Sequence, residues 1–127
     1  MAKLNGAITR HLASAAAQSD GLHDKAMKLH DDASACRRTG DLDGAMLLFA
    51  DAAEQEVDAV TQAIHECRLK WATILAVSAA AMYLDAGVSS PPSRWSAISD
   101  SLPFTSAQRE ELHKIWQHLT LHEASDK

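Results

Sequence analysis

Apolar residues recur every three or four positions along most of the chain, which is the spacing of one face of an α-helix. The clearest stretch ends just before Gly40, a residue type that commonly follows the last turn of a helix. Its apolar stripe consists of Leu22, Ala26, Leu29, Ala33 and Cys36. The pattern therefore predicts a helix over about 22–39.

A second apolar stripe begins directly after this glycine. Asp41 can cap the start of a helix, and the stripe then keeps one phase from Leu42 to Ile64. Its other members are Ala45, Phe49, Ala52, Val57 and Val60. One long helix is predicted here. Glu56 is the exception, because it projects onto the apolar face, and it indicates either a local break or a carboxylate that reaches the edge of the core.

The next stretch, about 67–86, is apolar on every side, which is typical of a helix buried by several neighbours. Neither Gly nor Pro separates it from the preceding helix. A straight helix over 42–86 would be about 67 Å long, too long for a compact domain of this size. We therefore expect a turn at 65–68.

The two ends of the chain are also predicted to be helical. The first helix covers about 3–18, and Ser19, Asp20 and Gly21 are expected to break it from the next. After Gly87, residues 88–93 form the clearest loop of the chain. A short helix then carries Trp95, Ile98 and Leu102, and Thr105 with Gln108 forms the capping-box pattern that opens a last helix.

These elements predict an all-α fold in one domain over residues 1–127. Its parts are a helix-pair core over about 22–87, the loop at 88–93 and C-terminal helices over 94–123. We expect about five to six helices packed as antiparallel pairs, with a four-helix-type bundle as the alternative. The composition agrees, since 46% of the residues are hydrophobic and 23% are charged, as in ordinary globular proteins.

Charge and hydropathy narrow the class of partner. The net charge of −5 disfavours binding to nucleic acid. The most apolar stretch, 69–84, is 16 residues long and contains Lys70, whereas a membrane span needs about 20 apolar residues. The N-terminus lacks the pattern of a signal peptide, and two cysteines fit a reducing compartment. A cytoplasmic protein is expected.

The segment from Ala33 to Ala53 resembles a tetratricopeptide repeat, in which small residues and one aromatic residue pack two antiparallel helices. The matching residues are Ala33 and Cys36 in the first helix, Gly40, Asp41 and Leu42 in the turn, and Ala45, Phe49 and Ala52 in the second helix. A partial second copy follows at Ala80, Tyr83 and Gly87. Gly87 lies 47 residues after Gly40, whereas regular repeats have a period of roughly 34.

Tetratricopeptide proteins generally bind proteins or peptides, so the resemblance implies a non-catalytic protein–protein interaction module with a protein or peptide partner. The helix at 67–86 needs cover on several sides, which a second copy of the chain could supply. We therefore expect a homodimer. Its partner-binding residues are predicted to be Trp71, Tyr83 and Trp95.

A small helical-bundle metal- or ligand-binding protein is the alternative function. Glu111, His118 and His122 share one stripe of the last predicted helix, and imidazole and carboxylate groups are zinc ligands. The spacing lacks the glutamate of zinc-peptidase helices, and two histidines on a helix margin are the simpler interpretation. We therefore expect no metal and no cofactor.

Other chemistry is disfavoured. Cys36 is followed by two arginines that could lower the pKa of a nucleophilic thiol, but its place on the apolar stripe favours a packing role. Glu110 and His113 have the spacing of di-iron bundles without the second copy that such sites need. Neither a glycine-rich phosphate loop nor a nucleophile elbow is present, so an enzyme is not expected.

The stretch from residue 41 to 66 is strongly acidic. It contains seven acidic residues and neither Lys nor Arg. These residues are Asp41, Asp43, Asp51, Glu54, Glu56, Asp58 and Glu66. Such a run is typical of a solvated outer face, and a basic helix of a partner is the alternative reason for it.

Overall fold

The computed structural model describes the main chain of residues 2–88 and 90–125, and the side chains of residues 18–88 and 90–117. Within these residues the chain is helical, without a strand, which confirms the predicted all-α bundle of about five helices. The helices are α1 (Ala2–Arg38), α2 (Leu42–His65), α3 (Leu69–Asp85), α4 (Ser93–Ser99) and α5 (Ser106–Ser125).

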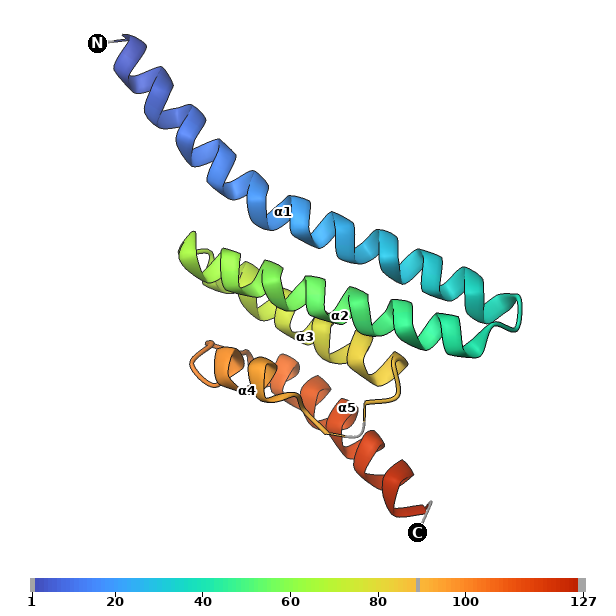
Figure 1. Cartoon of the computed structure of the whole chain (residues 1–127). Helices are drawn as coiled ribbons and strands as arrows, with labels where there is room; N and C mark the ends of the chain where they lie inside the picture. Colours follow the sequence, from blue (N-terminus) through green and yellow to red (C-terminus); the bar gives the residue numbers. More distant parts are fainter. Residues whose placement is uncertain (1, 89, 126–127) are drawn as a thin grey trace.

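The helices form a layered stack in which neighbours along the chain are neighbours in space (Figure 1). α1 and α2 form an antiparallel pair, and α3 returns along α2. α4 and α5 pack against α3, and α4 also reaches α2. α2 and α3 are therefore the central helices, and the core lies on both sides of them.

The turn between α1 and α2 follows the predicted pattern. Gly40 has a φ of +89°, a backbone conformation that glycine adopts without strain. Asp41 then caps α2, because its Oδ1 accepts a hydrogen bond from the Gly44 amide at 2.9 Å. The predicted seam of the pair is confirmed, since Ala33, Ala45, Phe49 and Ala52 are all at most 2% exposed.

α2 continues without interruption through Glu56, so the predicted long helix is confirmed and a local break is excluded. It ends at the predicted turn. Cys67 has a φ of +59° there, and the Arg68 amide donates to the Ala63 carbonyl oxygen at 2.9 Å. This closing hydrogen bond reverses the chain without the glycine that such turns usually contain.

The predicted break at residues 19–21 is wrong, because α1 runs through it. Ser19 is fully buried, and its hydroxyl donates to Glu66 Oε1 at 2.6 Å. This contact with the end of α2 holds the segment as a helix, and it outweighs the roughly 1 kcal/mol by which a helical glycine such as Gly21 is disfavoured. Within the helix predicted over 3–18, Leu4, Ile8 and Leu12 repeat at four-residue spacing, and they lie outside the described side chains.

The capping box at the start of α5 is confirmed. The Thr105 amide donates to Gln108 Oε1 at 2.9 Å, and the Gln108 amide donates to Thr105 Oγ1 at 3.1 Å. This reciprocal cap fixes the entry of α5, which then places Leu112 and Ile115 on the core. In the described part of the chain, no helix has both the length and the apolarity to cross a bilayer.

Candidate functional site

The described chain contains one fully buried carboxylate, Glu56, in the middle of α2. Its Oε2 accepts a hydrogen bond from Ser78 Oγ on α3 at 2.7 Å. Its Oε1 lies 2.9 Å from His23 Nδ1 on α1. Burial raises the pKa of Glu56, and the hydrogen bonds from Ser78 and His23 oppose that rise. The expectation that this carboxylate reaches the edge of the core is therefore wrong, because partners from two other helices satisfy it inside.

The geometry around Glu56 is that of a three-helix contact rather than of a nucleophile with its base. Ser78 gives its hydroxyl hydrogen to Glu56, so His23 does not act on that hydroxyl here. The His23 ring instead packs edge-on against Trp71, with 5.2 Å between ring centroids. We name Glu56, His23 and Ser78 the buried polar cluster. Its position means that it holds α1 against α2 and α3.

A second polar contact ties α4 to α2. Arg94 donates to Glu54 Oε2 at 3.2 Å and also binds the Asp58 carboxylate. The Tyr83 hydroxyl donates to Glu54 Oε1 at 2.7 Å. Burial and the neighbouring Glu54 carboxylate raise the pKa of the Tyr83 phenol. These contacts place α4 against the middle of α2, and Arg94 partly compensates the charge of two acidic side chains there.

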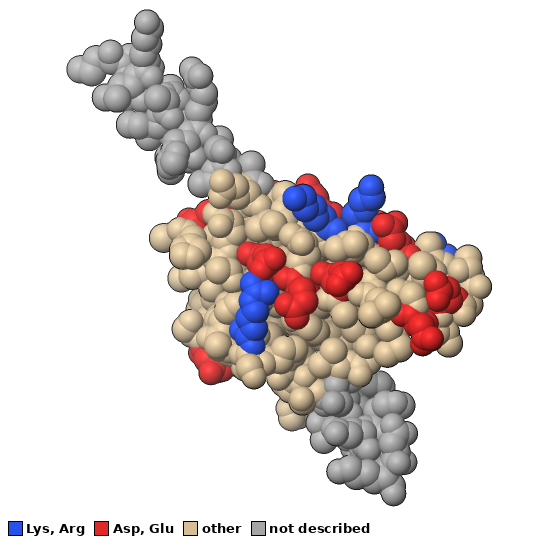
Figure 2. Space-filling model, viewed as in Figure 1, with Lys and Arg blue, Asp and Glu red and all other residues tan. Residues whose placement is uncertain are grey.

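The acidic residues of the 41–66 stretch can now be divided by their contacts. Figure 2 shows acidic side chains over the middle of α2 and at the end where α1 meets α2, while basic side chains on this face lie mainly over α1. Five acids are engaged within the chain: Asp41 as a helix cap, Glu54 and Asp58 with Arg94, Glu56 in the buried polar cluster, and Glu66 with Ser19. Asp43 and Asp51 are exposed and have no ion-pair or hydrogen-bond partner among the described residues.

The two remaining acids lie on the face of α2 that also carries exposed apolar side chains. A shallow groove of about 410 Å³ is lined by Asp43, Met46, Leu47 and Ala50 of α2 and by Ala86 after α3. We name these five residues the α2 groove. Leu47 is 70% exposed and Met46 is 46% exposed. The four α2 residues follow the i, i+3, i+4, i+7 spacing of one helix face, so the groove presents a continuous surface.

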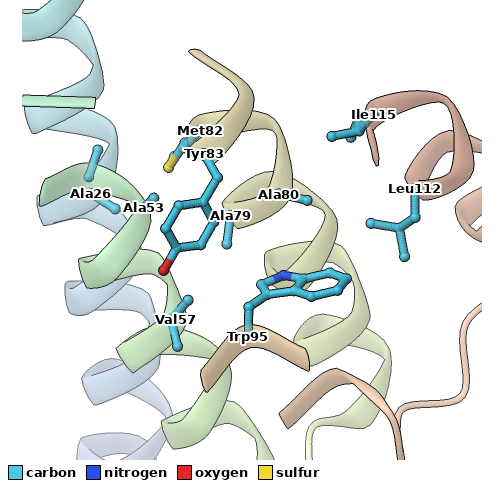
Figure 3. Packing of buried hydrophobic residues seen from close by; sticks show 11 residues of the cluster. Ala26, Ala53, Val57, Ala79, Ala80, Met82, Tyr83, Trp95, Leu112 and Ile115 are labelled. Carbon is cyan, nitrogen blue, oxygen red and sulfur yellow. The ribbon is translucent and has the colours of Figure 1, made fainter. Parts of the chain in front are cut away.

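The three predicted partner-binding residues differ in their exposure to solvent. Tyr83 and Trp95 are only 2% and 7% exposed, and they lie among the small side chains of α3 and α2 (Figure 3). The Trp95 indole donates to the Ala76 carbonyl oxygen at 2.9 Å, which satisfies its only polar atom inside the core. These two rings pack the chain's own core, and Trp71 is the one that stays partly exposed.

Of the three predicted metal ligands, the structure describes the side chain of one. Glu111 is exposed on α5, whereas His118 and His122 lie outside the described side chains. Within the described residues, His, Cys, Asp and Glu side chains form no group of three that could hold a metal ion. Cys36 is half-buried and packs beside the cluster around Phe49, as predicted for a packing residue.

Part of this arrangement follows from the sequence and part of it does not. The misplaced Glu56 on an apolar stripe was a usable signal of a buried carboxylate, but nothing in the sequence identified His23 and Ser78 as its partners. The α2 groove does not follow from the predicted apolar stripe, because Met46 and Leu47 lie off that stripe. The prediction that Leu42 lies on the core face is wrong, since it is 60% exposed at the first position of α2.

Comparison of the chain with known protein families, with characterised proteins and with solved structures finds no significant match, so the assignment of a function depends on the residues described above.

Proposed function

We propose that this protein is a non-catalytic protein–protein interaction module that binds an α-helix of a protein partner in the α2 groove. The observation that carries the proposal is the pair of large exposed apolar residues in the α2 groove, Met46 and Leu47, with the exposed Leu42 one turn before Met46. Single exposed apolar residues are ordinary, but a contiguous apolar surface usually marks a partner site. The resemblance of residues 33–53 to a tetratricopeptide repeat supports the same function, since such repeats generally bind proteins.

A helix is the partner element that suits this surface. The groove runs along one face of α2 and is walled on the other side by Ala86, where the small side chain allows a close approach. Helices bind such grooves by inserting apolar residues at i, i+3, i+4 and i+7. In the described part of the chain there is no strand edge to which an extended peptide could add. The surface therefore favours an amphipathic helix over a strand.

The test combines capture of a partner with a change in affinity. A photo-crosslinking residue replaces Leu47, the captured protein is identified, and its binding to the unmodified chain is measured by calorimetry. Leu47→Asp is expected to weaken that binding about 10-fold or more, because a leucine buried in an interface contributes about 1.5–3 kcal/mol. The matched control is Met27→Asp, which changes an apolar residue of α1 that is 36% exposed.

Equal losses in the Leu47 and Met27 variants would mean that the α2 groove is not the binding surface. No loss in either variant would have the same meaning. Circular dichroism of both variants tests whether the helices are retained, which separates lost binding from lost folding.

Self-association stays a separate prediction. The large exposed apolar residues of α3 are Leu69 and Ile74, at 45% and 51%. If a second copy covers this surface, light scattering at low micromolar concentration will give twice the 13.7 kDa of the chain. Ile74→Asp is then expected to give the single-chain mass. A single-chain mass for the unmodified protein, unchanged with concentration, would show that no homodimer forms.

A further inference from the structure

Two carboxylates of α2 have no contact partner among the described residues of the chain. Asp43 and Asp51 are exposed, and neither has an ion-pair or hydrogen-bond partner among the described residues. The other five acids of the 41–66 stretch serve as a cap, an interior hydrogen-bond acceptor or an ion-pair partner, as described above. Asp43 lies in the first turn of α2, where its charge complements the helix dipole, but this does not pair it with a cation. The other five acids have a hydrogen-bond or ion-pair partner, whereas Asp43 and Asp51 have none among the described residues.

Both unpaired carboxylates border the α2 groove. Asp43, Leu47 and Asp51 follow one another at four-residue spacing, so they lie on the same side of α2. The α-carbons of Asp43 and Asp51 are about 12 Å apart along the helix, at 1.5 Å per residue. Asp43 is itself part of the groove lining. The most exposed apolar side chain of the groove is thus flanked by a negative charge on each side.

Among the residues whose side chains are described, no Lys or Arg forms an ion pair with either carboxylate. The sequence has no Lys or Arg between Arg38 and Arg68. Arg37, in the last turn of α1, has its partners elsewhere. Its guanidinium lies 4.9 Å from the Phe49 ring centroid and 3.9 Å from the Asp85 carboxylate. Its charge is therefore directed toward Phe49 and α3.

We infer that the partner helix of the α2 groove is basic, with Lys or Arg about two turns apart on either side of its apolar anchors. This inference rests on the proposed function, because it specifies the charge of the helix that is proposed to bind the α2 groove. A cation opposite each carboxylate gives complementary potentials, which raise the association rate and disfavour acidic competitors. The same two charges repel an anionic lipid surface, so they favour a protein helix over a membrane.

The experiment uses the full chain and two synthetic helical peptides of 18 residues, labelled for fluorescence anisotropy. Both peptides carry Leu at i, i+3, i+4 and i+7 within an Ala and Gln background. One has Lys on either side of the leucines, two turns apart, and the other has Glu at the same positions. At low salt the Lys peptide is expected to bind roughly 3- to 10-fold more tightly than the Glu peptide, and the difference should shrink as salt is added.

Substitution of the two carboxylates tests whether they cause the preference for the Lys peptide over the Glu peptide. Replacing both, as Asp43→Asn with Asp51→Asn, is expected to remove most of the difference between the peptides while each still binds. The matched control replaces Asp31 and Asp32 with Asn on α1, where both are exposed and also have no partner among the described residues. It removes the same net charge from another helix, so the preference should persist.

The outcomes separate the two proposals. If both peptides bind equally and both are lost in Leu47→Asp, the groove is real and the charge inference is wrong. A preference that survives in the Asp43 and Asp51 double variant would assign it to the overall charge of −5 and would also overturn the inference. If neither peptide binds, or Leu47→Asp changes nothing, the groove itself is not a helix site and the proposed function is wrong.

Discussion

Replacing Phe49 with alanine is expected to lower the free energy of unfolding by about 3–5 kcal/mol, the usual cost of truncating a fully buried aromatic ring. The ring is 1% exposed. Its cluster contains Ala33, Ala45 and Ala86, whose side chains are too short to fill the space that the ring would leave. The His30 ring packs against it edge-on, with 5.2 Å between centroids. Urea unfolding followed by circular dichroism measures the loss.

Leu47→Ala is the matched control for this measurement. Leu47 is on the same helix but 70% exposed, so its truncation should change the free energy of unfolding by less than about 0.5 kcal/mol. A loss of less than about 1 kcal/mol for Phe49→Ala would contradict the packing of α1 on α2, and with it the repeat-like interpretation of this pair.

Removing the imidazole of the buried polar cluster, as in His23→Ala, is expected to lower the free energy of unfolding by about 2–3 kcal/mol at neutral pH. The substitution takes away one of two hydrogen-bond partners of the fully buried Glu56 carboxylate. The side chain of His23 is 26% exposed, so water can enter after truncation and the loss stays below that of a closed interior pair.

The pH dependence of this loss has a definite sign. Burial raises the pKa of Glu56 in the folded chain above its ordinary value of 4.5. The folded state therefore binds more protons than the unfolded state between pH 4.5 and the raised pKa. Protonation of Glu56 relieves the cost of burying its charge, so stability from this group rises as the pH falls through that window. The part of the His23→Ala loss that comes from the Glu56 charge should shrink in the same direction, because protonated Glu56 no longer needs a partner for a negative charge.

The control is Glu56→Gln, which keeps the shape of the side chain and removes its charge. In that background, His23→Ala should cost distinctly less and should no longer depend on pH, and the double-mutant cycle isolates the coupling between the two residues. The prediction fails if the loss from His23→Ala is the same with Glu56 and with Gln at position 56, or if it grows on acidification.

The sequence predicted those elements of the fold whose signals are local. The helix end at Gly40, the Asp41 cap and the Thr105–Gln108 box each need only residues a few positions apart, so their types and spacing are sufficient. The uninterrupted stripe of α2 is equally local. Such features depend on backbone geometry that is shared by all helices, and tertiary contacts did not overrule them here.

Features that depend on residues far apart in the chain were beyond prediction. Ser19 and Glu66 are 47 positions apart, and their hydrogen bond turned an expected break into continuous helix. His23 and Ser78 reach Glu56 from two other helices, so a carboxylate on an apolar stripe had partners that spacing alone could not identify. The exposure of Leu47 likewise depends on what lies opposite it in space and not on its place in a pattern.

The order of the layers also bears on how quickly the chain reaches its native state. Each helix packs mainly on the next one or two along the sequence: α1 on α2, α2 on α3, and α3 on α4 and α5. Because few distant segments have to meet, little loop-closure entropy is lost before native contacts form. Topologies of this kind fold in roughly microseconds to milliseconds. A chain emerging from a ribosome could therefore assemble its α1–α2 pair before α4 and α5 have been synthesised.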